Sequence, residues 1–253
     1  ISLHKLRMNI FDNYNIQNIE AFPERDNANK RVFSEAKMSV CISLMQKKKK
    51  ISLFDFRINS DKKIDIDNPP FKISSNDIKI IDSMYYTIPQ LQRQEWEVVN
   101  KIFQNSIKLK DIAHCCTGEV DMTQDKKFIT SLKSDLKLYK GAMLDRYIER
   151  QTISQGAIEF LSKSFIDIKP KRAEASRVTR IALQGITGIN ERIRIKATII
   201  PSNTFCANSV NYIDFTNCSY NYKYILALLN SRLLNFIFKK FSTNSNVNGY
   251  EVD

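Results

Sequence analysis

The first part of the chain contains apolar residues at a helical spacing, followed by a run with the composition of a strand. Leu3, Leu6 and Ile10 follow a helical spacing, which predicts an amphipathic helix over residues 2–13. The run IQNIEAF (16–22) has the composition of a strand. The chain is therefore expected to begin with a helix that leads into a β-strand.

The next two apolar runs predict a β-hairpin. After a polar loop, the run Ser39–Met45 predicts a strong buried strand, and ISLFDFRI (51–58) predicts a strand that returns beside it. The four lysines Lys47–Lys50 fit a tight, solvated turn between the two strands. Contact with phosphate is the alternative role for these lysines.

A change in composition after this hairpin predicts a boundary. Residues 59–67 are acidic and polar and end in Asn68-Pro69-Pro70, which interrupts regular structure. A helix should follow, because Trp96, Val99 and Phe103 recur at helical spacing. The predicted organisation is a small mixed-sheet fragment, a linker with a bridging helix, and a larger domain, over residues 1–58, 59–104 and 105–253.

The larger domain combines short strands with helices. LKDIAHCCTGEVDMTQDKKFI (109–129) predicts strand, loop and strand. Further strands are expected in FIDIKPKRAEASRVTRIAL, RIRIKATIIPS and FCANSVNYI. NYKYILALLNSRLLNFIFKKFS (221–242) predicts one amphipathic helix. The fold class that these patterns indicate is α+β.

Positive charge is concentrated in one stretch. Lysine and arginine number 39 against 27 acidic residues, a net charge of +12. Residues 169–196 hold eight basic and two acidic residues, which is half of that net charge. Arginine and lysine alternate there with β-branched residues, a pattern that predicts cations on one face of a strand. Such a face suits a phosphate backbone, and a solvated edge that discourages strand pairing is the alternative.

Other kinds of chemistry have little support in the sequence. The five cysteines include no CxxC pair and only two histidines are present, so we expect no metal site. The cysteines fit a reducing cytoplasm, and no run approaches a membrane span or a signal peptide. His114 beside Cys115 is expected to be a buried structural histidine. The chain begins at Ile1 without a methionine, and we expect it to be part of a longer protein.

Five motifs occur in an order that is similar to a known family. They are the HKLR helix leading into RVF-x5-SVCISLMQK, then LKDIAHCCTGEVDMTQDKKFI, LKLYKGAMLDRY, RIALQGITGINERIRIKATIIPSNTFCANSVNYI, and YILALLNSRLLNFIFKKFSTNSNVNGYEV. Together they resemble the TaqI-like DNA N6-adenine methyltransferases, in the half that follows the catalytic motif. The QGITGINERIR stretch and the NSNVNGYE ending resemble the adenine methyltransferases of type IIS restriction systems of the BsaI and BsmBI kind. The likeness covers most of the chain outside residues 59–100.

The resemblance implies a bacterial, cytoplasmic restriction-modification protein. Residues 1–58 would complete the methyltransferase sheet, and residues 105–253 would be the target-recognition domain. The implied partners are double-stranded DNA, the missing N-terminal catalytic half and a cognate restriction endonuclease. The parent enzyme would use S-adenosylmethionine. This chain has no glycine-rich loop after a first strand, so we expect it to bind no cofactor and to be inactive alone.

Two other functions remain open. Asn68-Pro69-Pro70-Phe71 spells the family's catalytic tetrapeptide, so a self-contained methyltransferase is one alternative. However, the residues before it are half charged. In the family, the tetrapeptide also precedes the VF element (here Val32-Phe33), whereas in this chain it follows that element. A linker turn therefore fits it better. The second alternative is a generic nucleic-acid-binding specificity subunit, which should show two repeated halves that this sequence lacks.

The resemblance also assigns site residues. Phe33, in the VF element, would stack on the flipped-out adenine, and a core phenylalanine is the alternative. Lys37 would meet a phosphate or lie in solvent. The residues expected to contact DNA are polar or basic and comprise Lys37, Thr117, Thr123, Lys126, Lys127, Lys171, Arg172, Arg177, Arg180, Gln184, Thr187, Asn190, Arg192, Arg194, Lys196 and Asn246.

Overall fold

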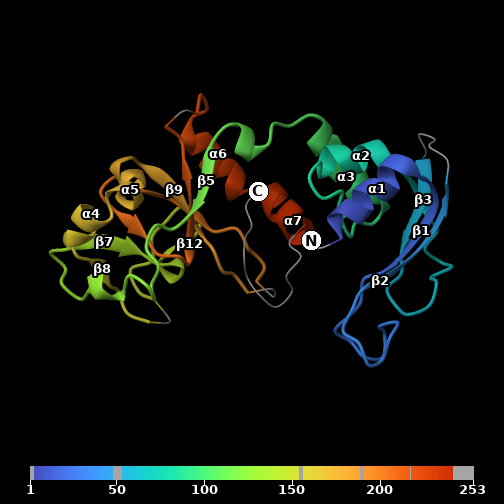
Figure 1. Cartoon of the computed structure of the whole chain (residues 1–253), viewed down its shortest axis with the longest axis horizontal. Coiled ribbons are helices and arrows are strands. Elements are labelled where there is room, and N and C mark those ends of the chain that lie inside the picture. Colours follow the sequence, from blue (N-terminus) through green and yellow to red (C-terminus); the bar gives the residue numbers. More distant parts are fainter. Residues whose placement is uncertain (1–2, 48–52, 154–155, 189–190, 217, 242–253) are drawn as a thin grey trace. The chain divides into compact units, whose positions relative to one another are not determined.

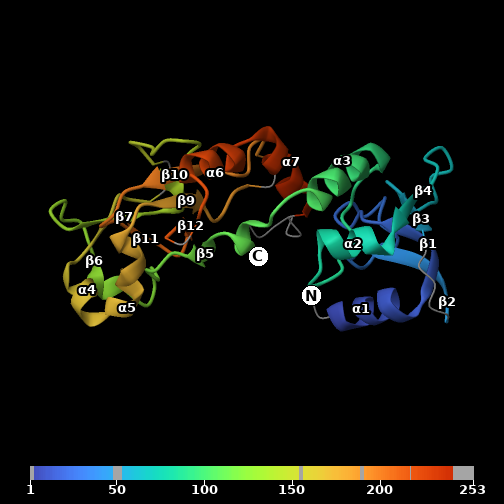
Figure 2. The same cartoon turned by 90° about the horizontal axis from the view of Figure 1, so that it is seen from above.

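The chain folds into two compact units, Ile1–Ser106 and Ile107–Asp253 (Figures 1 and 2). The structure is a computed structural model that describes residues 3–47, 53–153, 156–188, 191–216 and 218–241. Both units combine helices with small sheets, so the prediction of an α+β fold is confirmed.

The first unit is a four-stranded sheet with three helices on one face (Figures 1 and 2). Its elements are α1 (His4–Asn13), β1 (Asn15–Phe22), β2 (Val40–Gln46), β3 (Leu53–Ile58), β4 (Phe71–Ser74), α2 (Ser75–Ile81) and α3 (Arg93–Gln104). The strand order is β2-β1-β3-β4. β1 runs parallel to β3, and the other two pairs are antiparallel.

The predicted hairpin of the second and third strands is wrong, because β1 lies between them. Phe54, Phe56 and Ile58 of β3 are buried, and Phe54 meets Phe11 of α1 with ring centroids 6.2 Å apart. A strand that buries three large apolar side chains needs neighbours on both sides and helices above it. β2 takes the sheet edge instead, with Ile42 and Leu44 exposed, so the prediction of a buried strand there is also wrong.

Residues 59–104 are part of the first unit and do not form a linker. They supply β4, α2 and α3, and Trp96 and Val99 of α3 are buried. The acidic stretch before β4 is an ordered connection between two neighbouring strands, held by the fully buried Asn59. The Asn59 side chain accepts the N–H of Asp65 at 2.7 Å and donates to Glu20 at 3.0 Å.

The second unit contains two small sheets. The first, ordered β10-β9-β12-β5, and the second, ordered β11-β7-β8-β6, each have four strands. The strands are β5 (His114–Thr117), β6 (Ile129–Thr130), β7 (Leu136–Tyr139), β8 (Phe160–Leu161), β9 (Arg180–Gln184), β10 (Ala197–Ile200), β11 (Phe205–Cys206) and β12 (Val210–Asp214). The helices are α4 (Ser164–Ile168), α5 (Pro170–Ala173), α6 (Tyr222–Leu229) and α7 (Arg232–Phe241).

Helices cover both sheets of the second unit. Ile225 and Leu229 of α6 pack against Ile181 and Leu183 of β9, and Phe165 of α4 packs against Leu138 of β7. The predicted strand over FIDIKPKRA is wrong, because this segment forms α4 and α5, and Pro170 stands at the first position of α5, which suits proline. The expected C-terminal helix is divided at Asn230, between α6 and α7.

Candidate nucleic-acid interface

The cations of residues 169–196 do not share one face of a strand. β9 is an interior strand with β10 and β12 beside it, and all of its residues up to Leu183 are buried. Ala182 packs with Tyr139 and Met143 on one face of the sheet, and Ile181 packs under α6 on the other. The expected cationic ribbon is therefore wrong, because both faces of this sheet are covered.

Arg180 belongs to a buried polar cluster that we call the inner arginine site: Arg180, Glu119, Thr204 and Tyr212. The Arg180 side chain is 1% exposed. It donates to both carboxylate oxygens of Glu119, at 3.1 and 3.3 Å, and to the carbonyl of Thr204 at 2.6 Å. Its guanidinium carbon lies 4.5 Å from the centre of the Tyr212 ring. The prediction that Arg180 contacts DNA is wrong, because its donors point into the protein.

Burial sets the protonation behaviour of this cluster. Burial raises the pKa of Glu119, and the neighbouring Arg180 guanidinium acts in the opposite direction. Burial also raises the pKa of the Tyr212 hydroxyl and of the Cys206 thiol. An arginine whose hydrogen bonds reach two other chain segments serves to join them, here the segments before β6 and before β11 to β9.

The segment between β9 and β10 is also tied inward. Arg194 is buried, with its guanidinium carbon 5.1 Å from the centre of the Phe238 ring, and Thr187 is buried too. Lys196 pairs with Glu191, and the Gln184 amide donates to the carbonyl of Ile186 at 2.7 Å. The expectation that Arg194 and Thr187 lie on a DNA-facing surface is therefore wrong.

Two asparagines of the C-terminal helices hold this segment. The side-chain oxygen of Asn235 accepts the N–H groups of Arg194 at 2.7 Å and Ile195 at 3.3 Å, and its amide donates to the carbonyl of Arg192 at 3.2 Å. Asn230 pairs in the same way with both backbone groups of Ala197. RIRIK does not form a strand because the Asn235 side chain occupies backbone groups of Arg192, Arg194 and Ile195.

Gly185 of QGITG does not free a loop to enter a groove. A Cβ at Gly185 would stand 2.9 Å from the carbonyl oxygen of Ser209, so glycine is needed for close backbone packing there. Gly118 is tighter still, with 2.1 Å from its Cβ position to the carbonyl oxygen of Ala207. These glycines bring loops together inside the unit.

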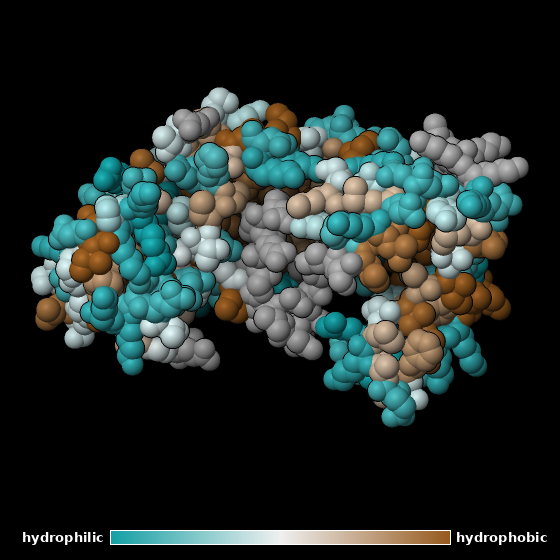
Figure 3. All heavy atoms as spheres, viewed as in Figure 1, coloured by the Kyte–Doolittle hydropathy of each residue, from teal (hydrophilic) through white to brown (hydrophobic). Residues whose placement is uncertain are grey.

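Five of the predicted cations are exposed and lie on segments that meet at one corner of the unit. We call them the outer basic patch: Lys126 and Lys127 on the 3-10 turn Lys126–Phe128, Lys171 and Arg172 on α5, and Arg177 on the 3-10 turn Glu174–Arg177. In Figure 3 the surface over α4 and α5 is mostly hydrophilic. These side chains can reach phosphates in solvent.

Asp125 holds the segments of the outer basic patch together. Its fully buried carboxylate pairs with Lys169 and with Arg172, the latter at 3.0 Å, and accepts the N–H of Asp121 at 2.9 Å. Burial acts to raise the pKa of Asp125, but the hydrogen bond from Lys169 and the nearby Arg172 outweigh it, so the pKa is lowered. The buried Asp125 carboxylate therefore fixes the segments that carry the outer basic patch.

The remaining predicted contacts of this unit lie in several places. Thr117 ends β5 and is exposed, as are Thr123 and Arg192. The Thr123 N–H donates to Asp121 at 2.8 Å. Asn190 and Asn246 lie outside the described residues.

Phe33 and Lys37 are both exposed in the first unit. Phe33 is 51% exposed, and its carbonyl accepts the N–H of Ala36 in a turn. The alternative of a core phenylalanine is therefore wrong. The exposed ring is free to stack on another flat group.

The Asn68-Pro69-Pro70-Phe71 tetrapeptide is used for folding. Phe71 is buried in β4, where its ring meets that of Phe56 edge-on at 5.7 Å. The Asn68 amide donates to the carbonyl of Ile58 at 3.0 Å, and the Pro70 carbonyl accepts from Arg93 at 3.2 Å. Because the Phe71 ring, the Asn68 amide nitrogen and the Pro70 carbonyl are all engaged within the unit, the structure favours a structural turn over the catalytic alternative.

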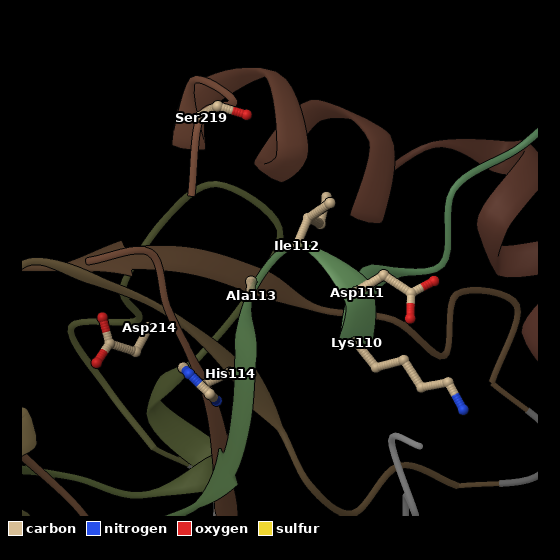
Figure 4. Close-up of a pocket in the computed structure, with 7 residues that line it drawn as sticks. All are labelled: Lys110, Asp111, Ile112, Ala113, His114, Asp214 and Ser219. Atoms are coloured by element: carbon tan, nitrogen blue, oxygen red, sulfur yellow. The ribbon is translucent and has the colours of Figure 1, made fainter. Parts of the chain in front are cut away.

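A surface pocket of about 260 Å³ lies where β5 begins and β12 ends, but it is not arranged for nucleophilic chemistry (Figure 4). His114 and Asp214 line it from paired strand positions. His114 is exposed, so the expectation of a buried histidine is wrong. Figure 4 shows Ser219 on a separate segment, well away from His114. Burial raises the pKa of the adjacent Cys115 to about 11, which keeps this thiol protonated.

Neither a metal-binding cluster nor a membrane-spanning helix is found among the described residues. Within residues 3–241, apart from the undescribed gaps, no group of three or more His, Cys, Asp or Glu side chains could hold a metal ion. None of the helices in the described part of the chain has the length and apolar character needed to cross a bilayer.

Sequence reasoning missed Asp125, Asn230 and Asn235 as organising residues. The signal for the asparagines is their position within LLNSRLLNF, where a polar amide interrupts an otherwise apolar helix face. A buried amide there must find partners, which predicts a side chain that serves nearby backbone groups. Asp125 carries no such local signal, because its partners are 44 and 47 residues away.

One family model matches part of the second unit. Residues 136–251 match the family model of the TaqI-like C-terminal specificity domain. Among solved structures, the chain is similar to the type IIL restriction-modification enzyme MmeI, determined in complex with DNA. That alignment covers 98% of this chain and 35% of MmeI, at 9% identity and a TM-score of 0.43, so the chain spans about a third of that protein's length. No curated protein matches the sequence.

Proposed function

We propose that the second unit recognises double-stranded DNA as the specificity region of a restriction-modification adenine methyltransferase. The observation that carries the proposal is the match of residues 136–251 to the TaqI-like C-terminal specificity domain. The outer basic patch supports it, because exposed lysines and arginines on a chain of net charge +12 provide the phosphate contacts that such a domain needs. Lys126, Lys127, Lys171, Arg172 and Arg177 are the proposed phosphate-contacting residues.

The parent enzyme is proposed to transfer a methyl group from S-adenosylmethionine to adenine N6. Residues of this chain do not fit the cofactor: the first glycine is Gly118, and all six lie in the second unit. Backbone approach to a nucleoside cofactor at a sheet edge requires glycine. The cofactor is therefore assigned to the N-terminal catalytic half, and this chain is assigned to DNA recognition.

The first unit is proposed to dock on that catalytic half. β2 is an edge strand whose Ile42 and Leu44 are exposed, and Leu53 of β3 is 64% exposed. Figure 3 shows hydrophobic residues gathered over this sheet. Exposed apolar side chains along an edge strand favour association, and the missing half of the same protein is the partner that the proposed function supplies.

Phe33 is proposed to stack on the extruded adenine. Its exposed ring offers an aromatic face, which a flipped base needs to offset lost stacking. Replacing Phe33 by alanine in the parent enzyme is expected to slow methylation strongly while leaving site selection unchanged, as measured by methylation-sensitive sequencing of treated DNA. Equal methylation by the variant would remove Phe33 from the site. Lys37 is proposed to meet a nearby phosphate.

The central test is DNA binding by the 253-residue chain. Fluorescence anisotropy with a labelled mixed-sequence duplex should show binding that weakens as salt rises, because released counterions drive the association. A selection from a random duplex library with the parent enzyme should enrich one motif. Lack of duplex binding at low salt would contradict the proposal, and tight binding of S-adenosylmethionine to this chain in calorimetry would favour a self-contained enzyme.

A generic nucleic-acid-binding subunit remains the second candidate for the exposed cations. It predicts duplex binding by the chain and no methylation by the parent protein. A cognate restriction endonuclease as a further partner is a proposal that co-purification from the source cells would test.

A further inference from the structure

One exposed aromatic residue of the second unit lies in a strained backbone conformation. Leu144 and Glu149 bridge to close a tight turn, in which the N–H of Asp145 donates to the carbonyl of Ile148 at 3.0 Å. Tyr147, within this turn, has a φ of +68°, in the left-handed region that L side chains avoid. The Tyr147 side chain is nevertheless 49% exposed. We refer to residues 144–149 as the Tyr147 turn.

The chain invests several contacts in keeping the Tyr147 turn in place. The N–H of Tyr147 donates to the carbonyl of Ala197 at 2.8 Å, which fastens the turn to the start of β10. Arg150 donates to Asp145 through two guanidinium nitrogens, at 3.1 and 2.9 Å. Partial burial acts to raise the pKa of Asp145, but the N–H of Arg146 and the guanidinium of Arg150 outweigh it and lower the pKa. These internal contacts therefore hold the turn in its conformation without a ligand.

A second tyrosine with positive φ has packing contacts that explain its strained conformation. Tyr86, at φ +50°, is half-buried, with its ring 6.1 Å from that of Phe11 and 5.2 Å from the Lys79 ammonium. Packing against the first unit's core offsets its strain. The exposed Tyr147 ring has no such core packing to offset its strain, and strain at an exposed residue is typical of a functional position.

The charge beside the ring favours an anionic ligand. The guanidinium carbon of Arg146 lies 5.7 Å from the centre of the Tyr147 ring, and one of its nitrogens donates to the carbonyl of Asn230. No salt bridge in the described part of the chain neutralises Arg146, whereas Arg150 pairs with Asp145 and Lys137 with Glu149. An exposed ring next to an unneutralised guanidinium matches the arrangement along DNA, where sugars and bases offer apolar faces beside the phosphates.

We propose that the Tyr147 turn is a DNA-contacting element, in which the Tyr147 ring packs on a sugar or base of duplex DNA and Arg146 orients the ring and faces a phosphate. This inference rests on the proposed function and adds a contact to it that the basic patch does not contain. The share of the contact made by the Tyr147 ring is not ionic, so removing the ring should lower affinity without changing the salt dependence, to which Arg146 would contribute through its phosphate.

The following variants distinguish the effect of losing the Tyr147 ring on DNA binding from any effect on folding. Tyr147→Gly removes the ring and also relieves the strained φ, so its melting temperature should equal or exceed that of the unchanged chain. Its affinity for a labelled mixed-sequence duplex should fall about tenfold, the size expected for a lost aromatic contact with a nucleotide. The slope of log affinity against log salt should not change. Tyr147→Phe, which keeps the ring, should bind within about twofold of the unchanged chain.

Two controls keep the result clear. Tyr224→Ala removes a tyrosine that is 56% exposed on α6 of the same unit and should leave binding unchanged. Tyr147→Asn, which also tolerates positive φ, replaces the glycine variant if that variant folds poorly. Unchanged binding by Tyr147→Gly overturns the inference and leaves the proposed function standing. Absence of duplex binding by the unchanged chain overturns both.

Discussion

Arg177 and Arg180 belong to the same RVTR stretch but lie in opposite environments. Arg177 ends a 3-10 turn and is exposed, whereas Arg180 opens β9 and is 1% exposed. The difference is decided by Glu119, which lies 61 residues earlier and meets the Arg180 guanidinium in the interior. A count of cations therefore overstates the surface available to DNA, because part of the charge is used to join strands.

The inner arginine site and the outer basic patch should also differ in energy. Removing one partner of a buried ion pair lowers the free energy of unfolding by several kcal/mol, because the other charge stays in a poorly solvated place. Apart from Arg172, which pairs with Asp125, the exposed cations of the outer basic patch should contribute little to stability, since water solvates them in both the folded and the unfolded chain. Substitutions at the two places should thus affect different measurements, with unfolding for the inner site and DNA binding for the outer patch.

The largest effect is expected from removing the partner of Arg180. Glu119→Ala should lower the free energy of unfolding by about 3–5 kcal/mol, because it leaves a buried guanidinium without its anion. Urea denaturation followed by circular dichroism measures this loss. Glu174→Ala, which removes an exposed acid beside the outer basic patch, is the control and should change stability by no more than about 0.5 kcal/mol. Equal losses in the two variants would erase the distinction between the regions.

A second pair of arginines repeats the comparison. Arg192 is exposed and Arg194 is buried, and the side chain of Asn235 contacts the backbone of both. Asn235→Ala should lower the free energy of unfolding by about 2–3 kcal/mol, because buried N–H groups lose their acceptor. Arg232→Ala, at an exposed position of the same helix, should have little effect in the same urea experiment. A silent Asn235→Ala would mean that water replaces the amide.

Much of the fold could be predicted from local patterns. The helical spacing of Trp96 and Val99 identifies α3, and the spacing of Leu3, Leu6 and Ile10 identifies α1. The prediction of α3 succeeds because this helix buries the face that its sequence defines. In α1 the spacing identified the helix but not its buried face, because Leu3 and Leu6 are exposed and Phe11 is the buried residue. The order β2-β1-β3-β4 could not be predicted, since a strand's pattern does not name its neighbours.

The candidate site was harder to predict than the fold. Lys126, Lys171 and Arg177 were expected to contact DNA and are exposed, as that role requires. Arg180 and Arg194 have the same alternating pattern, but their partners come from distant segments that no local spacing reveals. The division of the last helix at Asn230 has the same origin, because its amide pairs with Ala197 of β10.

Asp125 connects the two kinds of region and gives a pH-dependent prediction. Its folded pKa lies below the usual 3.8, so its contribution to stability is present above about pH 4 and is lost as the pH falls through the folded pKa. Asp125→Asn should lower the free energy of unfolding by about 2 kcal/mol at neutral pH, because the buried partner of Lys169 and Arg172 loses its charge.

The gap between Asp125→Asn and the unchanged chain should narrow as the pH falls below about 4, where the native carboxyl also takes up a proton. Urea unfolding at a series of pH values measures that gap. Asp167→Asn, on the exposed side of α4, is the control and should follow the unchanged chain throughout. A gap that stays constant across the acid range would show that the Asp125 charge contributes nothing.

The smallest effect on stability, and the clearest effect on DNA binding, should come from the outer basic patch. Lys171→Ala combined with Arg177→Ala removes two exposed cations and should leave the unfolding free energy within about 0.5 kcal/mol of the unchanged chain. If both contact phosphates, the slope of log affinity against log salt should decrease by about 0.9 for each. Lys223→Ala, an exposed lysine of α6, should leave that slope unchanged. An unaltered slope in the double variant would place this corner away from DNA and leave the Tyr147 turn as the proposed contact to pursue, because its aromatic contribution does not depend on salt.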